Sequence, residues 1–299
     1  MLAKVTSCAV IGLECQKVDV EIDIGGHQLI AFSVVGLPDA AVQEARERVR
    51  SAIKNSGIRF PQRHLTVNLA PGDLKKEGPG FDLPIATGIS LASDQIHYNL
   101  DDALLIGELS LDGRVKHTNG ILPIAIWART KGYKTLFIPE INAEEASLIQ
   151  GIKVMPVKSL GQLLEHIKGI KKIDPLPYQG IDKFQKEPYF EQDFAYIKGQ
   201  EHVKRALEIA ASGSHNLIMI GPPGAGKTLI AKTSPSVLPK MTEDEVLEVT
   251  KIYSIAGLLP SNQPLITKRP FRSPHHSASS AALIGGCLLY TSPSPRDRS

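Results

Sequence analysis

Residues 221–228, in the last third of the chain, have the types and spacing needed to hold a phosphate chain. They read GPPGAGKT, which satisfies the pattern G-x-x-x-x-G-K-[ST] without a mismatch. Glycines let the backbone approach an anion closely, and successive N–H groups can then point at phosphate oxygens. The ammonium group of Lys227 would neutralise the β- and γ-phosphates, and the Thr228 hydroxyl would ligate Mg²⁺. The predicted contacts to ATP are Gly221, Pro222, Pro223, Gly224, Ala225, Gly226, Lys227 and Thr228.

Such a loop works where a strand leads into it and a helix leads out of it. The apolar run NLIMI, residues 216–220, predicts the strand, and TLIAK, residues 228–232, predicts the first turns of the helix. The helix N-terminus would add its partial positive charge to the anion site. The alternative is a glycine turn that only joins a strand to a helix.

Phosphoryl transfer needs more than this loop. An acidic residue after an apolar strand must hold Mg²⁺ and orient water, and a neighbouring subunit must supply an arginine. The acids that follow Thr228 are Glu243, Asp244, Glu245, Glu248 and Asp297. The first four lie in MTEDEVLEVTKI, where Thr242 and Glu245 have the spacing of a capping box and predict a helix start. We therefore assign no catalytic residue within this chain and expect no ATP turnover from it alone.

Length and composition indicate an ordinary globular protein with about two domains. The 299 residues are 42% hydrophobic and 22% charged, and the net charge of +3 neither proves nor excludes a nucleic-acid partner. The cysteines are few and unpatterned, which fits a reducing compartment. No signal peptide and no apolar run long enough to span a bilayer are visible, so we expect a cytoplasmic protein without a membrane partner.

Alternating strand and helix patterns predict an α/β domain over residues 1–168. VDVEIDIG, HLTVNLAP and TLFIPE favour strands, and ALLIGELSLDGRV favours a hairpin that turns at Asp112-Gly113. LPDAAVQEARERVRSAIKNSG favours a helix that Asp39 caps and Gly57 ends, and DLPIATGISLAS, ILPIAIWARTKG and LGQLLEHIK favour three more. Residues 169–192 are rich in proline, glycine and charge and predict a linker. A second domain would begin near residue 193.

Several long motifs together resemble one family, the magnesium-chelatase-like AAA+ ATPases of the YifB/ComM type. They are IKGQEHVKRALEIAASGSHNLIMIGPPGAGKT, RPFRSPHHSASSAALIGG, VVGLPDAAVQEARERVRSAI and LAPGDLKKEGPGFDLPIA. The resemblance implies an α+β Lon-protease-like domain followed by a P-loop α/β domain. It also implies a homo-hexamer that drives DNA branch migration with ATP. Gly199 and Gln200 match a motif near the adenine; otherwise they are a plain helix N-terminal turn.

The same resemblance bears on proteolysis, because Lon-like proteases use a serine nucleophile and a lysine base. The serine position falls on Gly80 in the loop GPGFD, and the lysine position falls on Leu122 in NGILPIAI. Neither chemical group is present, so we expect no protease activity and a role in assembly or DNA contact. Nearby Lys75 and Lys76 are expected to be solvated charges.

Two basic segments are candidates for DNA contact. Arg46, Arg50 and Lys54 recur every four residues and predict a stripe on one helix face, although a solvated face balanced by Glu44 and Glu47 explains the same pattern. KRPFRSPHH, residues 268–276, precedes a loop that the family places near a central pore.

Metal binding has little support in the sequence. His275, His276 and Cys287 form a poor set because adjacent histidines point apart, and Cys8 and Cys15 lie too far apart for a zinc knuckle.

The last residues differ from all that precedes them. The family pattern runs to Gly286, so the second domain would cover residues 193–286, and CLLYTSPSPRDRS, residues 287–299, has no helix or strand period. We expect a gene product shortened at its C-terminal side, with a foreign tail at residues 287–299.

Three functions stay open. The first is an ATPase motor that acts on DNA. The second is a motor that inserts magnesium into porphyrins, although true chelatase motor subunits lack a Lon-like domain in front. The third is a non-enzymatic module that self-associates or binds DNA.

Overall fold

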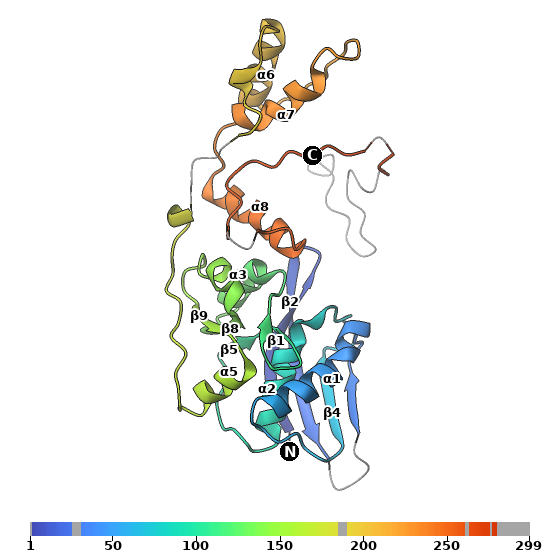
Figure 1. The fold of residues 1–299 in the computed structure, drawn as a ribbon, viewed down its shortest axis with the longest axis vertical. Coiled ribbons are helices and arrows are strands. Elements are labelled where there is room, and N and C mark those ends of the chain that lie inside the picture. The colour runs from blue at the N-terminus through green and yellow to red at the C-terminus, as the bar shows by residue number, and fades with distance from the viewer. Residues whose placement is uncertain (1, 26–30, 185–189, 261–262, 276, 280–299) are drawn as a thin grey trace. The chain divides into compact units, whose positions relative to one another are not determined.

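The computed structural model describes residues 2–25, 31–184, 190–260, 263–275 and 277–279 (Figure 1). The chain divides into two compact units. The first comprises residues 1–187 with 242–267, and the second comprises residues 188–241 with 268–299. No helix among the described residues is long and apolar enough to cross a membrane.

The first unit begins with a four-stranded sheet in the order β1-β2-β4-β3. Its strands are β1 (Leu2–Ile11), β2 (Glu14–Ile24), β3 (Phe32–Val35) and β4 (Leu65–Ala70). All neighbours are antiparallel except β3 and β4, which are parallel. Alternate residues of β2, from Val18 to Ile24, are buried, which is the period-two pattern of a sheet with one face on the core. The predicted strands VDVEIDIG and HLTVNLAP are confirmed.

Two helices cover this sheet. Helix α1 (Ala40–Asn55) begins where Asp39 Oδ1 accepts a hydrogen bond of 2.8 Å from Val42 N, and Gly57 follows its end with a φ of 77°. Both predicted helix limits are therefore confirmed, and both have a capping cause. Helix α2 (Asp82–Ala92), preceded by the short turn η1 (Pro79–Phe81), is buried on nearly every side. Its almost wholly apolar sequence follows from that position.

A second, parallel sheet has the order β5-β8-β9. It comprises β5 (Ala103–Leu105), β8 (Thr135–Pro139) and β9 (Lys153–Val157), with α3 (Ile121–Thr130), η2 (Glu140–Asn142), α4 (Ala143–Ala146) and α5 (Leu160–Ile167) beside it. The predicted hairpin is shorter than expected. Only β6 (Glu108–Leu109) and β7 (Val115–Lys116) form it, because residues 103–105 pair with β8 instead.

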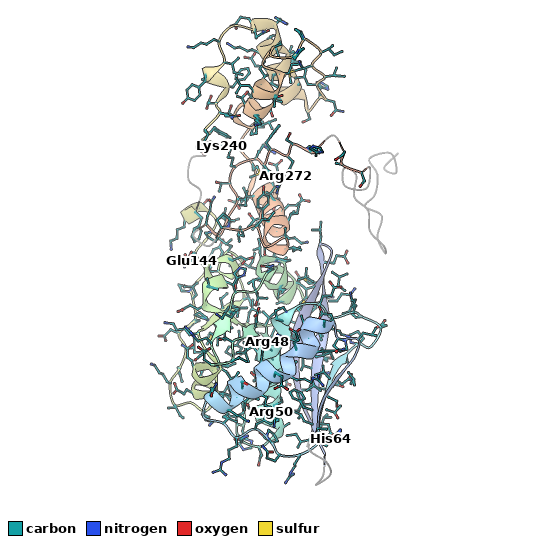
Figure 2. The ribbon with its side chains drawn as sticks, turned by 45° about the vertical axis from the view of Figure 1, so that its right-hand side comes forward. Arg48, Arg50, His64, Glu144, Lys240 and Arg272 are labelled. Atoms are coloured by element: carbon teal, nitrogen blue, oxygen red, sulfur yellow. The ribbon has the colours of Figure 1, made fainter. Side chains whose placement is uncertain are left out.

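Helices α1 and α2 are joined by an ion pair that the sequence did not reveal. Arg48 Nε lies 2.7 Å from Asp82 Oδ2, and Arg48 also donates to the Ala41 carbonyl at 2.9 Å. Asp82 is fully buried and also accepts a hydrogen bond of 3.1 Å from Leu109 N. Burial raises the pKa of Asp82 to about 6, although the Arg48 guanidinium acts to lower it. Figure 2 labels Arg48 on α1.

The second unit contains η4 (Phe194–Tyr196), α6 (Glu201–Gly213) and α7 (Lys227–Val237), held by a small cluster of Ile197, Leu207 and Ile230. The predicted strand over residues 216–220 is wrong. Its apolar side chains are largely exposed, with Ile218 at 83% and Ile220 at 91%. The described part of this unit contains no strand that could pair with this segment, so its backbone forms no ladder.

Two segments do not follow the predicted domain limits. Residues 242–267, which contain α8 (Glu243–Ile255), belong to the first unit instead of continuing a second domain from 193 to 286. The predicted linker, 169–192, lies partly on the first unit. Ile173 and Ile181 are buried there, η3 (Asp182–Phe184) follows, and Leu176 N donates to Val154 O at 2.9 Å.

We predict that Arg48→Met destabilises the first unit more at pH 8 than at pH 5. In the unchanged protein the raised pKa of Asp82 means that its contribution to stability is full below about pH 4 and falls as pH rises through about 6. Without Arg48 the pKa rises further, so an unpaired buried carboxylate costs about 3 kcal/mol at pH 8. At pH 5 the carboxyl stays protonated and the loss is smaller. Urea unfolding at both pH values measures the difference.

The double variant Arg48→Met/Asp82→Asn is the control, because it cannot ionise at position 82, so its own free energy of unfolding should differ less between pH 5 and pH 8 than that of the single variant. An equal loss at pH 5 and pH 8 in the single variant would contradict the assignment of this ion pair.

Candidate nucleotide-binding loop and a protease-like cavity

Residues 221–226 form an exposed loop that leads directly into α7. Gly224 and Gly226 have φ values of 81° and 79°, in the left-handed region that side chains with a Cβ avoid. Gly226 is the N-cap of α7, so Lys227 and Thr228 occupy its first two helical positions. The free N–H groups of the first helical turn therefore point back toward the loop.

Lys227 folds back over this loop. Its Nζ donates to the carbonyls of Gly221 at 2.8 Å and Pro222 at 2.7 Å. These bonds lie at the surface, so water can replace the carbonyl partners and the ammonium group can turn toward a bound anion. The Thr228 hydroxyl lies exposed at the same helix end.

Gly199 and Gln200 form a second unusual turn in this unit. Both have left-handed backbone angles, with φ of 65° and 58°, and Gln200 is the N-cap of α6. A left-handed residue other than glycine costs about 1–2 kcal/mol, so the surroundings must hold it in place. Ile197, just before the turn, packs with Ile230 of α7, which fastens this segment to the helix that carries Lys227. The role of both residues at the adenine stays a prediction.

The acids that follow the loop serve helix α8. Thr242 and Glu245 form both halves of the predicted capping box, with Glu245 Oε2 accepting from Thr242 N at 2.9 Å. Glu243 and Asp244 lie in the first turn, where negative charge stabilises the helix dipole. Glu248 lies exposed further along α8, and Asp297 lies outside the described residues.

The first unit contains a cavity of about 380 Å³ beside the loop that would carry a protease nucleophile. Gly80 lines it, and a Cβ there would lie 3.3 Å from Ile106 Cγ1 and 3.4 Å from Thr118 Cγ2. A serine side chain at this position would therefore be in tight contact with both neighbours. Leu122, at the lysine position, is fully buried.

Lys76 was expected to be a solvated charge, but its side chain is fully buried. Its ammonium group donates to the Pro71 carbonyl, and burial lowers its pKa. Its backbone also bonds to the start of α1, since Asp39 N donates to Lys76 O at 3.1 Å. Lys76 therefore holds the loop before Gly80 in place. Lys75 is exposed, as expected, and pairs with Glu77 at 2.7 Å.

A buried carboxylate at the N-terminus of α3 was missed by the sequence reasoning. Glu145 Oε1 accepts from Leu122 N at 2.9 Å and from the Ser254 hydroxyl, and Oε2 accepts from Asn142 Nδ2 at 3.1 Å. Burial raises the pKa of Glu145, and its three donors act to lower it. The N-cap of α3 is Gly120, which has no side chain to cap the helix, so Glu145 supplies the cap from α4.

The predicted basic stripe is only partly free for phosphate. Arg50 lies half-buried with its guanidinium 5.5 Å from the Phe60 ring centre, and Arg46 Nε donates to Gln43 O at 3.1 Å (Figure 2 labels Arg50). Lys54 is exposed. In the second segment, Lys268 lies 4.7 Å from the Phe190 ring centre and Arg269 Nε donates to Pro239 O at 2.8 Å.

No group of three metal-ligating side chains occurs in the described part of the chain. His275 bonds to the Ser277 hydroxyl at 2.7 Å, whereas His276 and Cys287 lie outside the described residues.

Cys8 and Cys15 are distant in sequence but lie on the paired strands β1 and β2. A hydrogen bond between their thiols raises the pKa of Cys8.

Comparisons with known proteins identify the relatives of both units. A family model described as subunit ChlI of Mg-chelatase matches residues 20–142, and a second, described as magnesium chelatase, subunit ChlI, matches residues 193–295. The chain belongs to the magnesium-chelatase ChlI-like family. The resemblance seen in the motifs is thereby confirmed.

Three relatives match along 95% of this chain. They are an uncharacterized protein of Mycobacterium tuberculosis (42% identical), the competence protein ComM of Haemophilus influenzae (40%) and the uncharacterized protein YifB of Escherichia coli (39%). The chain spans only 55–56% of the length of these relatives.

A partial similarity supports the fold class of the first unit. The Lon protease of Buchnera aphidicola is 31% identical over 135 residues, which are 42% of this chain and 17% of that protein. The mixed α/β fold with a Lon-like first part is confirmed.

We predict that Gly80→Ser yields no peptidase activity. The new hydroxyl would have no base beside it, since Leu122 has replaced the lysine, and the added Cβ would press on Ile106 and Thr118. We expect no cleavage of a fluorogenic casein and a loss of about 1 kcal/mol in free energy of unfolding.

Gly72→Ser is the matched control, because a Cβ at Gly72 meets nothing within 4 Å. Cleavage by the Gly80→Ser protein, absent from the unchanged chain and the control, would show that the cavity still supports proteolysis.

Proposed function

We propose that this chain carries the nucleotide-binding part of an AAA+ ATPase that uses ATP with Mg²⁺. The observation that carries the proposal is the loop 221–228, in which two left-handed glycines lead into a helix that starts at Lys227. In this proposal backbone N–H groups and Lys227 hold the β- and γ-phosphates, and the Thr228 hydroxyl ligates Mg²⁺. Gly199 and Gln200 would lie near the adenine.

We further propose that the full-length protein is a DNA-acting motor that works as a homo-hexamer. The name of one relative, a competence protein, supports a role with DNA, as do the exposed Lys54 and the basic segment at residues 268–275. Hydrolysis would use an acid that lies outside this chain and an arginine of the neighbouring subunit. An arginine supplied in this way contributes about 10³–10⁵ in rate in other phosphate-loop enzymes.

The second candidate is a motor that inserts magnesium into a porphyrin, which the names of the matching family models favour. The Lon-like first unit argues against it. Insertion of magnesium into protoporphyrin by the full-length protein, together with hydrolysis of ATP, would decide for this candidate. A non-enzymatic module that self-associates or binds DNA is the third, and nucleotide binding that depends on Lys227 would argue against it.

We predict that Lys227→Ala weakens nucleotide binding at least tenfold without changing the thermal stability. Lys227 bonds only to two carbonyls of an exposed loop, so its loss should leave the melting temperature within about 1 °C, as is usual for surface substitutions. Titration of residues 1–299 with a fluorescent ATP analogue and Mg²⁺ should show weak binding. The affinity should fall at least tenfold in the variant, because the phosphates lose their main positive charge.

The same preparation should not hydrolyse ATP above background, with or without DNA. Turnover by residues 1–299 that disappears in the Lys227→Ala variant would contradict the assignment of catalysis to groups outside this chain. Equal nucleotide affinity in the unchanged chain and in the Lys227→Ala variant would contradict the assignment of the nucleotide site to residues 221–228.

For the full-length protein we expect ATP hydrolysis that DNA stimulates and branch migration that requires ATP. DNA affinity should fall steeply as salt rises from about 50 to 200 mM, because binding to phosphates releases counterions. A DNA affinity independent of salt, or hydrolysis that DNA leaves unchanged, would argue against the motor. Lys227→Ala should bind DNA equally well but fail to migrate junctions, which separates the two activities.

A further inference from the structure

Helix α8 follows the nucleotide loop in the sequence but packs on the first unit. Its buried residues Val246, Thr250 and Ser254 recur every four positions and form one stripe, and α8 lies against α3 (Figure 1). Thr250 Oγ1 accepts a hydrogen bond of 3.0 Å from Ile266 N, so the chain after α8 is fastened to it as well. Leu265 in that segment is fully buried. Residues 242–267 are called the clasp below.

The clasp is held by the buried Glu145. The Ser254 hydroxyl donates to Glu145 Oε1, the same oxygen that accepts from Leu122 N. Gly120 N, at the start of α3, donates to Ser254 O at 3.0 Å. Ser254 therefore satisfies both a buried carboxylate and a helix N-terminus. If α8 left this position, both groups would lose a partner in a site that water reaches poorly.

The turn after α8 makes a second close contact. Gly257 has a φ of 66°, and a Cβ there would lie 2.7 Å from Asn119 Nδ2. Asn119 lines the 380 Å³ cavity together with Gly80. The end of the clasp thus touches the segment that borders the protease-like cavity.

Only a short connection joins the clasp to the helix that begins at Lys227. Helix α7 ends at Val237 and the α8 cap is Thr242, which leaves four residues, 238–241, between them. Four residues span at most about 14 Å when extended. The end of α7 and the start of α8 are therefore joined by a short covalent tether.

We propose that the clasp couples the nucleotide loop to the first unit. Binding of ATP with Mg²⁺ at residues 221–228 and the seating of Ser254 on Glu145 then change each other's free energy, because linkage between two sites is reciprocal. This inference rests on the proposed nucleotide site, but the seating of the clasp is a separate property. Leu122 occupies the position of the protease base. Its backbone amide donates to the same Glu145 oxygen that accepts from Ser254 of the clasp.

Two variants loosen the clasp in different ways. Ser254→Ala removes the hydroxyl that Glu145 accepts, and Gly257→Ala introduces a Cβ against Asn119 in a backbone conformation that alanine avoids. Glu248→Gln, on the exposed side of the same helix, is the matched control. Circular dichroism with thermal unfolding confirms that each protein is folded. None of the three changes touches the nucleotide loop.

Hydrogen exchange without nucleotide tests the seating. Both loosening variants should exchange the amides of Gly120 and Leu122 at least about tenfold faster than the control, as expected when a buried hydrogen-bonded site opens more often. Unchanged exchange at these amides in both variants would overturn the clasp.

Titration with a fluorescent ATP analogue and Mg²⁺ tests the coupling. The loosening variants should change the dissociation constant by about fivefold or more, whereas Glu248→Gln should match the unchanged chain. Equal affinities in all four proteins would overturn the coupling even if the loop binds nucleotide. No nucleotide binding in any protein would overturn the proposed function and the coupling together, and the exchange result alone would then decide the seating.

Discussion

The carboxylate of Glu145 has to be compensated inside the protein, and the start of α3 and helix α8 both contribute to that compensation. A buried carboxylate is costly unless donors surround it, and here three donors come from three places in the chain: Asn142, the start of α3 and Ser254. The positive end of the α3 dipole adds to this compensation. Glu145 thus bonds both to the start of α3 and to α8. Figure 2 labels Glu144, the residue before it on α4.

The positions that the resemblance assigns to the nucleophile and the base of Lon-like proteases are occupied by Gly80 and Leu122. At Gly80 the missing side chain lets Ile106 and Thr118 approach, and at Leu122 the side chain fills the core while the backbone amide binds Glu145. Lys76, although buried close by in sequence, bonds to the Pro71 carbonyl and holds a loop. Lys76 therefore has a structural partner. The nucleotide loop is the opposite case, because its polar groups are exposed and bonded only to themselves.

Local signals allowed much of this structure to be predicted from the sequence. Asp39, Gly57 and the pair Thr242 and Glu245 act within a few residues of themselves, so their capping roles were readable directly. The loop GPPGAGKT was readable for the same reason. Pairs of residues distant in sequence could not be predicted in this way. Arg48 and Asp82 are 34 residues apart in the sequence, and Glu145 and Ser254 are 109 residues apart. The spacing of apolar and polar residues along the chain does not indicate which distant residues pair.

The strand predicted at residues 216–220 failed for a related reason, since an apolar run becomes a strand only beside another strand. The placement of α8 likewise depended on a carboxylate in another part of the chain.

The central claim is that residues 221–228 form a cradle for the phosphates of ATP. Backbone amide NMR of residues 1–299 during titration with ATP and Mg²⁺ tests it most directly. We expect the amide signals of Gly224, Gly226, Lys227 and Thr228 to shift together and saturate, and Lys227→Ala to remove the shifts. Signals in this loop that stay unmoved while others in the chain shift would contradict it.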